Sequence, residues 1–154
     1  KIFLDFPSDS PSKIDNDPIV SDALGAVPKE LLRGKDDILA ILDNESKIKH
    51  MKPDFNKIYE LDCRGLIISA EGNHVDFVSR FFGPKCGINE DPVTGSLNAG
   101  LAMWLIHSGM MKDRYVVSQG TILGRRGRVY VEKRYNDIWV GGDVIICVDG
   151  QVRY

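Results

Sequence analysis

One segment, residues 95–108, limits the fold of this chain more than any other. Its sequence, GSLNAGLAMWLIHS, predicts a helix, and Gly109 is placed to end it. Apolar side chains lie on every side of that helix: Leu97, Leu101 and Leu105 form one row, Ala102 and Ile106 a second, Ala99 and Met103 a third, and Trp104 adds to them. A helix that is apolar all round is buried in the protein interior. We therefore expect strands from both flanking parts of the sequence to surround it.

Strand-like runs dominate the rest of the sequence. Apolar runs bounded by turn residues predict strands at residues 2–6, 37–43, 65–70, 76–82, 116–123, 128–133, 137–140 and 144–148. Asp17 followed by Pro18 is typical of a helix start, and this short helix is expected to end near Gly25. Residues 53–60 predict another short helix. With 154 residues, the chain is expected to form one compact unit over residues 1–154.

Composition excludes several classes of protein. Proteins that bind nucleic acids usually carry a strong excess of basic residues. The net charge here is −2, so a nucleic-acid partner is not expected. No apolar run reaches the 18 or more residues of a membrane span. The three cysteines, Cys63, Cys86 and Cys147, are too widely spaced for a zinc pattern and too few for a disulfide framework, which favours a reduced, cytoplasmic location. The chain opens without Met inside a strand-like run, and we expect it to be a piece of a longer protein.

The start of the apolar helix carries a candidate binding site. The first turn of a helix leaves N–H groups without partners and carries a partial positive charge. Gly95 would allow a ligand to approach the backbone closely, and Ser96 adds a hydroxyl, so a carboxylate or phosphate cradle is one interpretation. The other is that Thr94 or Ser96 only caps the helix. A phosphate loop is not favoured because the lysine of that motif is missing.

Asp91 is the candidate catalytic acid. Pro92 follows it and biases Asp91 to an extended conformation, which directs the carboxylate away from the helix, toward the space that the helix start faces. An acid near the positive end of a helix is stabilised as its anion. The alternative is a structural acid bonded to loop amides. The neighbouring Glu90 is expected to be solvated or paired with a basic residue.

A resemblance to a known family enters through this region. The segment FVSRFFGPKCGINEDPVTGS, residues 77–96, resembles the signature of the phenazine-biosynthesis PhzF-like isomerase family, in which a segment like RFF-P-GI-EDPVTGSAH precedes a buried helix. Further segments follow in the family's order: DFPS (5–8), ALG (23–25), PDF (53–55), RGLIIS (64–69), SQGTILGRRGR (118–128) and WVGG (139–142). The resemblance therefore covers nearly the whole chain.

The resemblance implies the diaminopimelate-epimerase-like fold. This is an α+β fold of two similar halves, each a β-roll or barrel wrapped around a central buried helix. The family's chains are about twice as long as this one, and residues 1–154 resemble only their C-terminal half. The missing N-terminal half of the same protein is thus an implied partner. The oligomeric state stays open, with a homodimer as one option.

The resemblance also implies a function and its residues. The whole protein would be a cofactor-independent isomerase or epimerase that moves a proton on a small carboxylate-bearing metabolite, without a metal. The family's proton-shuttling glutamate belongs to the first half and has no counterpart here, so this chain alone is expected to be inactive. Asp91 matches the acid of the second-half motif, and Gly95 and Ser96 match the turn that holds the substrate carboxylate. Thr94 lies near the position of the cysteine in related racemases, which makes a two-cysteine racemase unexpected.

One departure from the family pattern leaves other functions open. Where the family often has Ala-His after Gly-Ser, this chain has Leu97-Asn98, and Asn98, a candidate substrate contact, cannot titrate. A first alternative is therefore an inactive binding or scaffolding protein that keeps the fold, since fold does not fix function. A second is an anion- or nucleotide-binding module that uses the same helix start.

Overall fold

The computed structural model describes residues 1–6, 10–111 and 113–151. Its strands are β1 (Ile2–Phe6), β2 (Ser12–Ile14), β3 (Glu30–Arg33), β4 (Asp37–Ile41), β5 (Gly65–Glu71), β6 (Phe77–Gly83), β7 (Ile88–Asp91), β8 (Arg114–Gln119), β9 (Gly127–Arg134) and β10 (Asp137–Gly142). Its helices are α1 (Pro18–Leu24), α2 (Glu45–His50), α3 (Phe55–Glu60) and α4 (Gly95–His107), with short 3-10 turns η1 (Pro84–Cys86) and η2 (Thr121–Leu123). Pro7 and Ser8 of the DFPS match lie outside the described residues.

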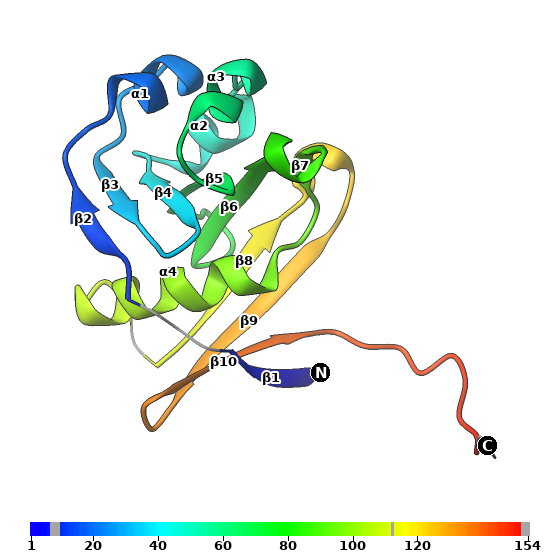
Figure 1. Ribbon diagram of the computed structural model, residues 1–154. Helices are drawn as coiled ribbons and strands as arrows, with labels where there is room; N and C mark the ends of the chain where they lie inside the picture. Colours follow the sequence, from blue (N-terminus) through cyan, green and yellow to red (C-terminus); the bar gives the residue numbers. More distant parts are fainter. Residues whose placement is uncertain (7–9, 112, 152–154) are drawn as a thin grey trace.

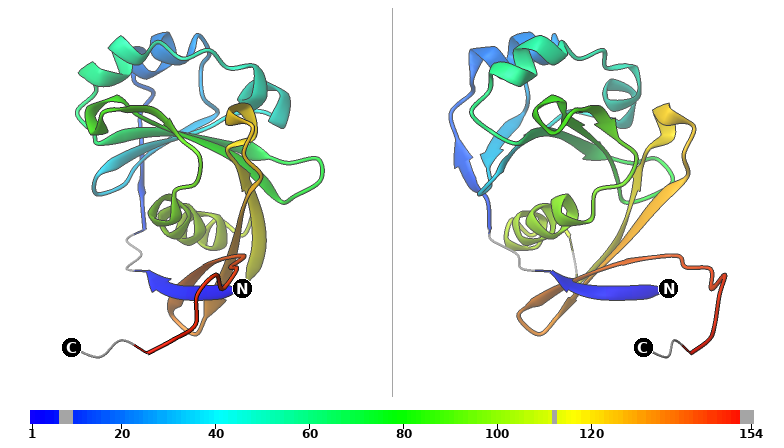
Figure 2. Two further views of the ribbon diagram at one scale, coloured as in Figure 1. Left: turned by 90° about the vertical axis from the view of Figure 1, so that its right-hand side faces the viewer. Right: turned by 45° about the vertical axis from the view of Figure 1, so that its right-hand side comes forward.

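All ten strands belong to one bent sheet. The strand order is β1-β10-β9-β8-β6-β5-β4-β3-β2, with β7 added beside β6. Neighbours are antiparallel except for the parallel pairs β4–β5 and β6–β8. The helices α1, α2 and α3 cover the outer face of the arm formed by β3 to β6, and α4 lies between that arm and the arm formed by β8, β9, β10 and β1 (Figures 1 and 2). The fold is therefore α+β, with a large sheet and few helices.

Two hydrophobic cores lie on the two faces of the sheet. Successive side chains of a strand point to opposite faces, so Leu39 of β4 packs in the core around α4 while Ile38 and Ala40 pack beneath the outer helices. In the same way Phe81 of β6 faces α4 and Phe82 faces the outer helices. Because β4, β5 and β6 are covered on both sides, their sequences are nearly continuous apolar runs.

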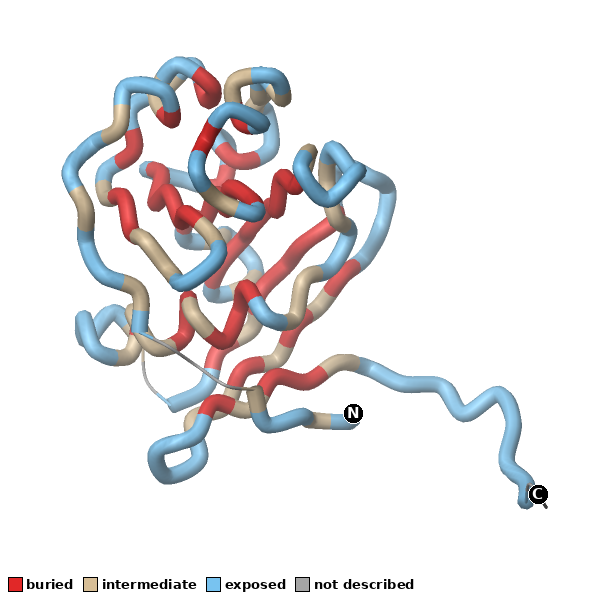
Figure 3. Tube along the Cα trace, viewed as in Figure 1, coloured by how far each residue is buried: buried red, intermediate tan, exposed pale blue. Residues whose placement is uncertain are grey.

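The predicted central helix is confirmed, but the prediction that it is buried on all sides is wrong. Helix α4 spans 13 residues, of which six are buried. The others are half-buried or exposed, and Ser96, Gly100, Met103 and His107 are among them. The cause is that β1 and β2 stand at the two ends of the strand order and do not pair, so the sheet is an open roll. Figure 3 shows buried and more exposed segments alternating along the helix.

Most other predicted elements are confirmed, and one strand is wrong. Helix α1 has the expected Asp17 cap, whose side chain accepts a hydrogen bond from the backbone of Ile19, and ends at Gly25 with φ 61°. By contrast, residues 144–148 form no strand, because no described strand lies beside them; Ile145 and Val148 are almost fully exposed. The strand predicted to reach residue 123 ends at Gln119. There Gly120 adopts φ 83°, and the chain turns into η2.

The short elements β2, β3, β7 and α2 were not predicted. Three of them are strands of three or four residues, too short for a periodic pattern. Helix α2 is largely polar, and its start is defined by the Asn44 side chain, which accepts a hydrogen bond from the Lys47 backbone at 3.0 Å. Local caps thus define helices that apolar periodicity does not reveal.

The described residues contain neither a membrane-spanning helix nor a metal centre. No helix among them is long and apolar enough to cross a bilayer. No group of three or more His, Cys, Asp or Glu side chains in that part of the chain is arranged to hold a metal ion. The three cysteines are free thiols, and burial raises the pKa of the Cys63 thiol.

Candidate active site

A tight turn between β7 and α4 positions the predicted acid. The Thr94 hydroxyl donates a hydrogen bond to Oδ2 of Asp91 over 2.5 Å. Pro92 and Val93 between them are exposed, whereas Asp91 and Thr94 are half-buried. The structure therefore brings Asp91 and Thr94 into direct contact at the start of α4, a contact that the sequence did not predict.

Gln119, at the end of β8, holds this turn from below. Its Oε1 accepts a hydrogen bond from the Thr94 backbone N–H over 3.1 Å. Its Nε2 donates to the Asp91 carbonyl and to the Thr94 hydroxyl oxygen, each over 3.1 Å. No role is predicted for Gln119 from the sequence. The only sequence signal was its place in the SQG segment, because 24 residues separate it from Thr94 in the chain and the contact is tertiary.

The first turn of α4 has no side-chain cap among the described residues. Thr94 is the N-cap residue, with φ −118° and ψ 103°, but its side chain makes no capping hydrogen bond. The interpretation that Thr94 only caps the helix is therefore wrong, because its hydroxyl is engaged by Asp91 and Gln119 instead. Gly95 is half-buried and Ser96 is exposed, so the first turn of α4 lies at the surface.

Asn98 lies on the opposite, inward side of the helix. It is fully buried, and its Nδ2 donates to the Thr94 carbonyl over 2.9 Å. The Tyr115 hydroxyl donates to the backbone carbonyl of Asn98 over 3.4 Å, and burial raises the pKa of Tyr115 far above its usual range. Asn98 Oδ1 is buried without a hydrogen-bond partner among the described residues. Asn98 thus supports the turn through Thr94 and has no exposed surface of its own.

Glu90, next to the predicted acid, forms a buried ion pair with Arg80. Arg80 Nε and Nη2 donate to the two carboxylate oxygens of Glu90 over 2.9 and 2.7 Å. Arg80 Nη1 donates to the carbonyls of Ile48 and Met51. This fork-to-fork geometry gives a strong, oriented pair. It fastens β7 to β6 one residue before Asp91.

A cavity lies beside α4, and Asp91 is not among its lining residues. It has a volume of about 270 Å³ and runs between the helix and the β3–β4 turn. Its apolar floor includes Leu39, Ile67 and Leu97, and its rim carries the Asp37–Arg64 ion pair. Ser96 lines this cavity and Asp91 does not. Ser96 is thus the one predicted site residue among the lining residues of this cavity.

Together, the fold and this turn define a class of protein: α+β rolls in which a bent sheet holds one helix, whose uncapped start carries a polar site. The comparison with family models then identifies the family. The chain belongs to the phenazine biosynthesis-like protein family (PhzC-PhzF), whose model matches residues 9–150.

Curated relatives agree with this assignment. The chain is 36% identical over 151 residues to an uncharacterized isomerase of Pseudomonas aeruginosa, covering 97% of this chain and 56% of that protein. A second uncharacterized isomerase of the same organism is 30% identical over 153 residues, covering 99% of this chain and 58% of that protein. The chain thus spans little more than half the length of these relatives.

Solved structures of the family share the fold. The crystal structure of a PhzF-family phenazine biosynthesis protein from Enterococcus faecalis matches with a TM-score of 0.80 and 35% identity, covering 90% of this chain and 52% of that chain. A putative phenazine biosynthesis PhzC/PhzF protein from Clostridium difficile matches with a TM-score of 0.79 and 30% identity, covering 99% of this chain and 57% of that chain. Both matches support the α+β roll described above.

Proposed function

We propose that this chain is the C-terminal half of a cofactor-independent isomerase or epimerase that moves a proton on a small carboxylate-bearing metabolite. The relatives' names as isomerases support the reaction class, and their greater length supports a second, N-terminal half. The observation that carries the proposal is the uncapped first turn of α4 beside the Asp91 carboxylate.

In the proposed site, the backbone N–H groups of Gly95 and Ser96 bind the substrate carboxylate. A helix start attracts anions because its free N–H groups and the helix dipole act in the same direction. The Phe6 ring lies 3.4 Å from where a Cβ of Gly95 would be, an ordinary van der Waals distance, so this ring lies beside the helix start. Thr94 contributes by holding the turn, and Asn98 holds Thr94 from the buried side.

Asp91 orients the substrate or takes part in proton transfer in the proposed reaction. The family's acid–base glutamate would come from the N-terminal half, across a cleft that the two halves form together. General acid–base catalysis contributes about 10²–10⁴-fold. Amide donors that are already aimed at developing charge add to this without reorganisation. The chemistry needs neither a cofactor nor a metal.

Substitution of Asp91 in the full-length protein tests the proposal. We expect Asp91→Asn to reduce isotope exchange from deuterated water into the substrate at least about tenfold, with an unchanged melting temperature. Asp76→Asn is the control, because the Asp76 carboxylate also accepts one hydrogen bond, from the Val116 backbone N–H, away from the site. If Asp91 only braces its loop, Asp91→Asn would lower the melting temperature and leave the turnover of the folded enzyme near wild type.

The isolated chain provides a second test. We expect the purified 154-residue chain to catalyse no proton exchange, because the proposed site needs the glutamate of the other half. Exchange by this chain alone would contradict the two-half site. A full-length protein that binds a small carboxylate without exchanging its protons would favour the binding or scaffolding alternative. A full-length protein that binds nucleotides instead would favour the anion- or nucleotide-binding module. A cytoplasmic location and a homodimer stay predictions.

A further inference from the structure

We propose that Gln119 is the positioning residue of the site: its amide holds the turn from Asp91 to Thr94 so that α4 keeps an open start. This inference rests on the proposed function, since it assumes that the first-turn amides bind a carboxylate. Gln119 lies on β8, and its side chain would touch no substrate. It would act through Thr94 and Asp91.

The side-chain amide of Gln119 is fully buried and its orientation is determined by its partners. Gln119 is 1% exposed. Its Oε1 faces the Thr94 backbone N–H, which can only donate, and its Nε2 faces the Asp91 carbonyl, which can only accept. Rotating the amide by 180° would place donor against donor and acceptor against acceptor. One conformation of the turn is therefore matched to one orientation of Gln119.

The contact with Thr94 also determines where the hydroxyl proton goes. A hydroxyl has one hydrogen to donate and lone pairs to accept. Thr94 Oγ1 accepts from Gln119 Nε2 over 3.1 Å, and it donates its hydrogen to Asp91 Oδ2. In this orientation the hydroxyl makes no capping hydrogen bond to the first turn of α4. Gln119 thereby orders Asp91 and leaves the amides of Gly95 and Ser96 to a ligand.

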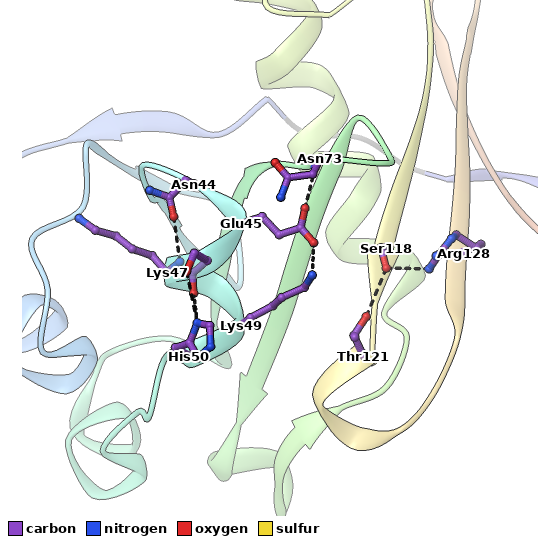
Figure 4. Close-up of polar contacts among 10 residues, drawn as sticks. Asn44, Glu45, Lys47, Lys49, His50, Asn73, Ser118, Thr121 and Arg128 are labelled. Atoms are coloured by element: carbon purple, nitrogen blue, oxygen red, sulfur yellow. Dashed lines mark hydrogen bonds and ion pairs between the residues drawn. The ribbon is translucent and has the colours of Figure 1, made fainter.

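The backbone at Gly120 and Gly127 packs closely against the carbonyl oxygen of Pro92 in the turn. Gly120 has φ 83°, and a Cβ there would lie 2.6 Å from the Pro92 carbonyl oxygen; at Gly127 it would lie 3.2 Å from the same atom. Ser118, the residue before Gln119 on β8, accepts a hydrogen bond from Arg128 over 2.7 Å and contacts the Thr121 hydroxyl over 3.4 Å (Figure 4). A rigid support of this kind is what keeps a binding geometry accurate.

The test measures the helix start directly, in the 154-residue chain and with sodium acetate as the probe. Backbone amide chemical shifts of Gly95 and Ser96 are followed by NMR during titration of wild type, Gln119→Met and Ser69→Ala. Methionine keeps the length of Gln119 but neither donates nor accepts at these sites. Ser69 is the matched control, a buried strand residue that bonds to Val78 and Ser79 away from the turn. Thr94→Val removes the hydroxyl that accepts a hydrogen bond from Gln119, and it changes no residue of the buried strand β8.

The expected result is that wild type and Ser69→Ala respond to acetate, while Gln119→Met binds it at least about tenfold more weakly, as a small displacement of a binding group allows. If Gln119→Met does not fold, Thr94→Val must give the same loss. Equal acetate binding by wild type and the folded variant would overturn the role of Gln119 and leave the proposed function standing. No response by wild type at these amides would overturn both.

Discussion

Arg80 and Glu90 form an ion pair that is almost completely removed from water. Each side chain is 7% exposed. Removing charges from water is costly, so such a pair persists only when its hydrogen bonds are well satisfied. Here the guanidinium donates to Glu90 and to two carbonyls and lies 4.8 Å from the centre of the Phe82 ring. Its position next to Asp91 makes it a structural support of the site.

We expect Arg80→Met to destabilise the chain by about 3–5 kcal/mol, because it leaves Glu90 buried without a partner. Arg80→Met combined with Glu90→Leu should recover much of this loss, since no uncompensated charge stays behind. Arg134→Met is the control: Arg134 pairs with Glu132 but is 42% exposed, so its loss should cost at most about 1 kcal/mol. Urea denaturation measures all three, and equal costs for the two single variants would disprove the importance of burial.

At the scale of elements, helix α2 depends on polar contacts at its start. Glu45 accepts a hydrogen bond from the Asn73 backbone over 2.6 Å and pairs with Lys49 one turn later (Figure 4). The Lys49 ammonium, and next the Asn73 N–H, hold the pKa of Glu45 below its ordinary value. Ile48 is the one buried apolar residue of this short helix, so packing alone stabilises the helix little. The polar contacts of Glu45 are therefore important for its stability.

The lowered pKa of Glu45 predicts how stability changes with pH. A depressed carboxyl pKa stabilises the folded state above the unfolded pKa of about 4.3, and this part is lost as pH falls through the lower, folded-state pKa. We expect Glu45→Gln to cost about 1 kcal/mol at pH 7, with the difference from wild type shrinking below about pH 4. Denaturation at several pH values measures it, with exposed Glu60→Gln as control. A difference that stays constant down to pH 3 would refute the linkage.

At the scale of the molecule, the roll is open on one side. The two edge strands β1 and β2 leave one side of α4 open. Beyond β10, the apolar segment of residues 144–150 runs away from the sheet (Figure 1). Ile145 is 86% and Ile146 79% exposed. Contiguous exposed apolar surface of this kind is typical of an interaction site, which agrees with the proposal of a second half.

This surface predicts self-association of the isolated chain. We expect sedimentation velocity to detect concentration-dependent association that Ile145→Lys with Ile146→Lys reduces, because each lysine replaces exposed apolar surface by charge. The stability of the fold should be unchanged, as neither side chain is buried. Val27→Lys, a change at an isolated exposed apolar residue on another part of the surface, should leave association as it was. Association that persists in the double variant would exclude this segment as its cause.

The features that sequence alone determined are those set by neighbouring residues. The Asp17-Pro18 start and Gly25 end of α1, the apolar runs of β5 and β6, and the apolar helix α4 all follow from local chemistry and periodicity. The motif ending at Ser96 was also sufficient to indicate the family, which the match over residues 9–150 confirms. Local pattern thus determined most elements and the place of the candidate site.

Only the tertiary structure decided which distant groups meet. Gln119 reaches Thr94, and Arg80 reaches Glu90, across strand pairings that no local pattern specifies. Apolar residues at 144–148 indicate a strand, but a strand forms only where another backbone completes its hydrogen bonds, and none described does so here. For the same reason α4 is apolar on all sides yet partly exposed. The sequence shows that all sides of the helix favour burial, but the path of the sheet decides which sides are covered.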